Sequence, residues 1–113
     1  MSDCIFCKIA ERKLPAKIVY EDPEIFAIED IHPQAPTHIL VCPRKHLMSL
    51  SDAVPEDAVM LGRILLVAAQ LAKERGLTDG YRTIFNTGRG ASQSVFHLHL
   101  HLLGGRAFRW PPG

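Results

Sequence analysis

The chain has 113 residues, enough for one compact domain with a hydrophobic core and too few for two ordinary ones. Its 13 lysines and arginines nearly balance 12 aspartates and glutamates, and a net charge of +1 argues against a general polyanion binder. Its apolar runs are too short to span a bilayer, and its three cysteines do not suit a disulfide framework. We therefore expect a soluble, cytoplasmic protein without nucleic-acid or membrane partners.

The first half of the chain predicts a short helix followed by three strands. Residues 4–13 suit the helix, and residues 17–22 and 24–30 suit two strands joined by a turn at Asp22 and Pro23. The third strand, residues 37–43, contains an unbroken apolar run of Ile, Leu and Val. Such a run indicates burial on both faces of a sheet.

The second half predicts one long helix and two further strands. Apolar residues recur at helical spacing over residues 55–75, with Pro55 in the first turn and Gly76 at the C-terminal end. Residues 81–86 and 95–103 suit strands, and residues 87–94 suit a loop between them. Mostly consecutive strands with one inserted helix predict an α+β fold with an antiparallel sheet.

Three of the six histidines, His97, His99 and His101, alternate with leucines inside the last predicted strand. Successive side chains of a strand point to opposite faces, so the three imidazoles should share one side and the leucines the other. We expect the leucines to face the core and the histidines to form a row on a working surface.

Such a row can supply a nucleophile and a proton donor together. Three imidazoles this close cannot all be cationic, so at least one should stay neutral and able to attack, while a protonated neighbour holds an anionic oxygen or protonates a leaving group. Surface histidines without a role, or a zinc ion on the row itself, are the alternatives. Both rank below phosphate chemistry, because zinc would need a ligand from elsewhere and residues 80–113 carry four arginines and no carboxylate.

The loop before the histidines suits a phosphate group. Gly88, Gly90, Ala91 and Ser92 are small, so backbone N–H groups can approach anionic oxygens, and Gln93 and Ser94 add polar side chains. A loop of this kind is most often only a turn. Its position directly before His97 makes it a plausible oxyanion cradle.

These segments resemble a known family. The run HLHLHLL at residues 97–103 is similar to the signature of the histidine triad superfamily, and residues 30–46, residues 86–106 and the terminal WPPG resemble its Hint branch. The resemblance implies a single domain over residues 1–113, whose five-stranded sheet and two helices join a second copy in a homodimer with a ten-stranded sheet. It also implies binding of purine nucleoside monophosphates and hydrolysis of adenosine phosphoramidates, with no cofactor required for catalysis.

The resemblance further implies a role for each site residue. His99 would attack the α-phosphorus to form a nucleotidyl-histidine that water hydrolyses, with His97 and His101 beside it and His38 as a fourth histidine. The implied nucleotide contacts are Asp30 for the ribose, Ile31 with Phe26 or Ile28 for the base, Asn86, Ser92, Gln93 and Ser94 for the phosphate, and Trp110 for the leaving-group side of the partner.

Two residues depart from the pattern of this family. Ser92 stands where the family usually has glycine, and a serine is costly there if the backbone needs a positive φ. His32 replaces a usual serine beside the ribose pocket. Neither departure touches the three alternating histidines.

A second cluster concerns zinc. Cys4 and Cys7, with His46 and His97, resemble the zinc ligands of some members of the superfamily, and two thiolates with two imidazoles would make a closed structural site. The alternative is a pair of packed thiols on a short helix. If zinc takes His97, that ring orients the site and does not touch phosphate.

Three functions therefore follow from the sequence. The first is a hydrolase that cleaves P–N bonds of nucleoside phosphoramidates through a histidine intermediate. The second is a nucleotide-binding or scaffolding dimer with little turnover, which the Ser92 departure would favour. The third is a zinc-dependent interaction module.

Overall fold

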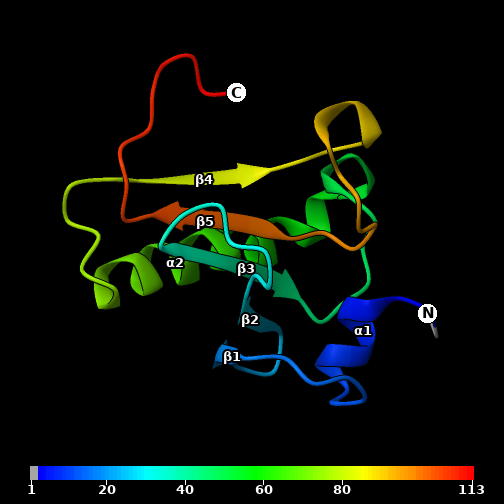
Figure 1. Ribbon diagram of the computed structural model, residues 1–113. Helices are drawn as coiled ribbons and strands as arrows, with labels where there is room; N and C mark the ends of the chain where they lie inside the picture. The colour runs from blue at the N-terminus through cyan, green and yellow to red at the C-terminus, as the bar shows by residue number, and fades with distance from the viewer. Residues whose placement is uncertain (1–2) are drawn as a thin grey trace.

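The computed structural model describes residues 3–113. Its centre is one antiparallel sheet of five strands in the spatial order β1-β2-β3-β5-β4. In Figure 1 the strands follow one another from top to bottom, with β4 at the upper margin of the sheet and β1 at the lower one. Its strands are β1 (Ile18–Glu21), β2 (Ile25–Glu29), β3 (Thr37–Pro43), β4 (Tyr81–Phe85) and β5 (Leu100–Gly104).

The long helix α2 (Ala58–Glu74) covers one face of the sheet, behind it in Figure 1. A 3-10 turn, Pro55–Asp57, leads into this helix, and Gly76 ends it with a φ of +70°, a left-handed conformation that suits glycine. The apolar side of α2 packs on the leucines that alternate with the histidines, all of which are at most 2% exposed. Within residues 3–113, no helix is long and apolar enough to cross a membrane.

The short helix α1 (Ile5–Ala10) packs on the opposite face. Phe6 and Ile9 point from it into a second apolar cluster, which the sheet completes with Phe26, Ile28, Leu40 and Cys42. Strand β3 is buried along its whole length, as its apolar run predicted, because it lies between two strands and under both helices. The predicted α+β fold with an antiparallel sheet is confirmed.

The last strand begins later than predicted. We expected a strand over residues 95–103, but β5 starts at Leu100 and its ladder with β3 ends at the pair of Val41 and Leu100. In the same register Cys42 and Pro43 would lie opposite His99 and Leu98, and Pro43 has no N–H to donate to the ladder. His97 and His99 therefore lie in an irregular segment before β5, on the face covered by α1.

Candidate active site and metal centre

His99 is held with one ring nitrogen free. Its Nδ1–H donates to the backbone carbonyl of His97 at 2.7 Å, so in the neutral ring the lone pair lies on Nε2. The ring is 9% exposed and lies beside the ring of His101, with 4.9 Å between their centroids. This arrangement leaves the Nε2 lone pair of His99 available for nucleophilic attack.

His101 is oriented by a chain of hydrogen bonds. The backbone N–H of Gln34 donates to His38 Nδ1 at 3.0 Å, which leaves the proton of neutral His38 on Nε2. That N–H donates to His101 Nδ1 at 2.9 Å, so neutral His101 keeps its own proton on Nε2, 3.5 Å from Nδ2 of Asn86. His101 therefore presents an N–H donor next to the free nitrogen of His99.

Burial keeps the histidine rings neutral. Desolvation lowers the pKa of His38, with the nearby carboxylate of Asp30 opposing it, and desolvation likewise lowers the pKa of His99. For His101, desolvation and then the charges of His99 and His38 lower the pKa to about 4. Neutral rings at neutral pH are the state in which the hydrogen bonds above are made.

This pKa predicts how stability depends on pH. The pKa of His101 falls from about 6.5 in the unfolded chain to about 4 in the fold, so the unfolded state binds more protons between these values. The free energy of unfolding should fall as pH drops from 6.5 to 4, by up to about 1.4 kcal/mol per pH unit for each such proton. Denaturant titrations should show a shallower pH slope for His101→Gln than for the wild type. An unchanged slope would contradict the buried, neutral state of His101.

The glycine-rich loop contains the predicted strain. Ser92 ends a 3-10 turn, Arg89–Ala91, with a φ of +66° in the left-handed region. Gln93 is buried, and its side-chain amide is used within the fold: Oε1 accepts from the N–H of Gly88, and Nε2 donates to the carbonyls of Met48 and Val95. Gln93 thus fixes the shape of the loop, while Ser94 is exposed beside it.

A glycine at position 92 should relieve this strain. We expect Ser92→Gly to raise the free energy of unfolding by about 1 kcal/mol, because a side chain in the left-handed region costs roughly that much. Equilibrium denaturation of the two proteins measures the difference. A less stable variant would mean that the interactions of the serine side chain stabilise the fold by more than the left-handed backbone conformation destabilises it.

The other residues implied for nucleotide contacts lie in different surroundings. Asp30 is near the histidines, with Oδ2 3.4 Å from His38 Nε2. Ile31 is 86% exposed and Trp110 is 85% exposed. Phe26 and Ile28 are buried in the apolar cluster under α1, whereas Asn86 is half-buried beside His101. The roles of these residues toward a nucleotide stay predictions.

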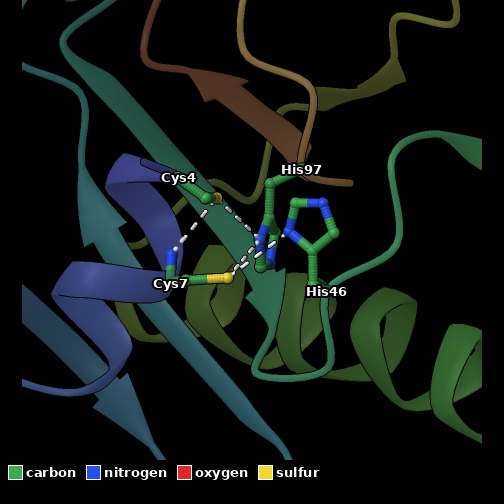
Figure 2. Close-up of side chains that lie close together, drawn as sticks. All are labelled: Cys4, Cys7, His46 and His97. Atoms are coloured by element: carbon green, nitrogen blue, oxygen red, sulfur yellow. Dashed lines mark hydrogen bonds between the residues drawn. The ribbon is translucent and has the colours of Figure 1, made fainter. Parts of the chain in front are cut away.

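His97 does not share the exposed row that the sequence suggested. It is fully buried, and its Nε2–H donates to the carbonyl of Pro43 at 2.7 Å. Its Nδ1 therefore carries the lone pair and points to the cysteines of α1, as Figure 2 shows. The row of histidines is split because the bent segment before β5 turns this ring under the helix.

The four residues of the cysteine cluster fit a tetrahedral zinc ion. Sγ of Cys4 lies 3.3 Å from His97 Nδ1, and Sγ of Cys7 lies 3.4 Å from His46 Nδ1 and 3.5 Å from His97 Nδ1. Zinc–sulfur bonds of about 2.3 Å and zinc–nitrogen bonds of about 2.0 Å in a tetrahedron place such ligand atoms roughly 3.5 Å apart. The carbonyl of Pro43 supplies the outer hydrogen bond that a ligating imidazole usually makes.

Without a cation, the thiol of Cys7 disfavours ionisation. Desolvation by burial, with the hydrogen bond and charge of Cys4, raises the pKa of Cys7 to about 11. A bound divalent cation would reverse this, because a coordinating thiol is deprotonated. The donor set thus has the chemistry of a metal site, although packed thiols on α1 would also account for the contacts.

Sequence reasoning missed the support behind His46. The neighbouring Lys45 binds Asp57, with 2.6 Å between Nζ and Oδ1, and the buried Asp57 also accepts the N–H of Val54 at 3.0 Å. This pair fixes the loop after β3 to the start of α2. The sequence did not reveal this role of Asp57, because an acidic residue in the first turn of a helix is already explained by its favourable interaction with the helix dipole.

The fold and site define a class of protein: an antiparallel α+β sheet that carries four histidines on one face, one of them shared with a cysteine cluster. The HIT domain model matches residues 11–108, and the chain belongs to the HIT family. Its architecture is that of the hydrolases and nucleotide-binding proteins of this family.

Known relatives cover almost the whole chain. An uncharacterized HIT-like protein of Synechocystis is 52% identical over 111 residues, which are 98% of this chain and 97% of the relative. The crystal structure of a HIT family hydrolase from Legionella pneumophila is 50% identical, with a TM-score of 0.96, and covers 98% of this chain and 100% of that one. A zinc-bound histidine triad family protein from Mycobacterium smegmatis is 36% identical, with a TM-score of 0.81, over 99% of this chain and 85% of that one.

Proposed function

We propose that this protein, as a member of the Hint branch, hydrolyses purine nucleoside phosphoramidates to nucleoside monophosphates through a nucleotidyl-histidine on His99. The observation that carries the proposal is the hydrogen bond of 2.7 Å from His99 Nδ1 to the carbonyl of His97. It fixes the tautomer whose Nε2 lone pair can attack phosphorus.

The same hydrogen bond would stabilise the nucleotidyl-histidine intermediate. When Nε2 bonds to phosphorus, the P–N bond breaks, and its electron pair leaves on the amine nitrogen, which takes up a proton from solvent. His99 keeps Nδ1–H, so the nucleotidyl ring is cationic, and the carbonyl oxygen of His97 faces that charge. Water then attacks the phosphorus and releases the monophosphate, a proton and neutral His99.

His101 and Asp30 would act on the two sides of the phosphorus. The N–H at His101 Nε2 can donate a hydrogen bond to a phosphoryl oxygen or to the leaving group, in a position fixed by His38. Asp30 has a carboxylate 20% exposed within reach of the same histidines, and it can accept hydroxyl groups of a ribose. We assign the base to the surface around Ile31.

We further propose a structural zinc ion held by Cys4, Cys7, His46 and His97. The donor distances support it, and the zinc-bound relative from Mycobacterium smegmatis supports it independently. The ion would link α1 to the loop after β3 and to the segment before β5. His97 would then orient His99 through its carbonyl and would not contact phosphate itself.

We also propose that two copies form a homodimer with a ten-stranded sheet. Among the described strands, β4 pairs only with β5, so its outer edge is open to another strand. Val59 and Leu66 on the outer side of α2 are 76% and 71% exposed, and Trp110 near the C-terminus is 85% exposed. A second copy would cover apolar side chains of this kind.

A nucleotide-binding dimer with little turnover is the second candidate. The left-handed Ser92 favours it, since a strained loop beside the histidines could hold phosphate in an unreactive position. Incubation with an adenosine phosphoramidate separates the two functions. Release of AMP over many cycles supports the hydrolase, whereas tight AMP binding without release supports the second candidate.

A further inference from the structure

Phe6 contacts both the buried metal-cluster histidine and the proposed nucleophile. Its ring meets His97 edge to face, with 5.8 Å between centroids and an interplanar angle of 82°, and it meets His99 in the same way at 5.0 Å and 79°. The side chain is 4% exposed. Phe6 is therefore a wall of the active site that comes from α1, far away in sequence.

The nucleophile needs a second constraint besides its hydrogen bond. The bond from His99 Nδ1 to the carbonyl of His97 fixes one point of the ring, and the ring can still tilt about that point. The ring of Phe6 packs edge to face on the His99 ring, with 5.0 Å between centroids. The ring of His101 lies on it as well, with 4.9 Å between centroids. Together these contacts fix the direction in which Nε2 points.

The position of Phe6 depends on how α1 is docked. The helix has only six residues, too few to be stable alone, and it is held by the apolar cluster and by Cys4 and Cys7, which flank Phe6. The cysteines face His97 and His46, so the groups that dock the helix also set the place of the aromatic ring.

We propose that Phe6 is a positioning residue for His99, and that the aromatic ring of Phe6 sets the direction in which His99 Nε2 points during nucleotidyl transfer. This inference rests on the proposed function for its effect on rate. The structural part of the inference is that Phe6 fixes the orientation of the His99 ring, and this part does not depend on a substrate. A flat aromatic side chain is required at this position. An aliphatic side chain of similar volume would fill the space but could not make the edge-to-face contact with the imidazole.

The test compares Phe6→Leu with Ile9→Ala. Ile9 lies in the same helix and the same apolar cluster at 8% exposure, but it makes no aromatic contact with the histidines. We expect Phe6→Leu to lower kcat about 10-fold or more with little change in KM, because small displacements of a reacting group are costly. Ile9→Ala should lose similar thermal stability and keep its kcat.

Nitrogen-15 NMR of the imidazoles gives a readout that needs no turnover. In the wild type and Ile9→Ala, His99 should show one tautomer with a protected Nδ1–H, and in Phe6→Leu this signal should broaden or exchange. If the wild type hydrolyses no phosphoramidate, the proposed function fails, and the NMR comparison still decides the role of Phe6. A wild-type His99 signal in Phe6→Leu, or an equal loss of kcat in both variants, would overturn the inference.

Discussion

Replacement of His99 with alanine should reduce phosphoramidate turnover by at least about 1,000-fold, because removal of a nucleophile usually costs this much or more. The neighbouring rings cannot substitute for it. His101 Nδ1 is occupied by His38, and both ring nitrogens of His97 face away from the site, toward Pro43 and the cysteines.

AMP affinity is the internal control for this variant. The ribose and phosphate contacts come from other residues, so equilibrium binding of AMP by calorimetry should stay within a few fold of the wild type. A variant that keeps its turnover would show that another group is the nucleophile. A variant that loses binding together with turnover would assign His99 to ground-state binding.

Loss of the proposed zinc ion should have the largest effect on stability. Purified protein should contain one zinc ion per chain by elemental analysis, and Cys7→Ser should lose it. We expect the free energy of unfolding to fall by about 3 kcal/mol or more, since a structural zinc ion contributes its binding energy directly to folding. Docking of α1 depends on this cluster, so the chelator-treated wild type should resemble the variant.

Cys42 provides the matched control for that experiment. It is a fully buried thiol in the apolar cluster, and no ligand atom of the metal group belongs to it. Cys42→Ala should keep one zinc ion per chain while losing some packing. A wild type without zinc, or a Cys7→Ser protein that keeps a full equivalent, would refute the zinc site.

The architecture could be predicted because local patterns decided it. Every predicted strand and both helices are present, and β3 has the same bounds as predicted, because its apolar run and Pro43 mark its ends. The start of β5 was wrong. Strict alternation of histidine and leucine indicates a strand, but the missing N–H of Pro43 on the neighbouring strand ends the ladder at Leu100.

The chemistry of the histidines could be predicted only in part. Sequence spacing grouped three imidazoles, and the family resemblance placed His97 with the cysteines, but neither could show that the ring of His97 is turned under α1. Nor could it show which nitrogen of His99 is free, because the acceptor is a backbone carbonyl. Phe6 gave no signal at all, since an apolar residue in a short helix is usually only core.

The central claim is a covalent bond between a nucleotide and His99, and rapid-quench intact mass spectrometry during turnover tests it most directly. We predict that wild-type protein mixed with an adenosine phosphoramidate gains the mass of one adenylyl group per active chain, and that peptide mapping places it on His99. Turnover without any adduct at early times, or an adduct of equal yield in His99→Ala, would contradict the account.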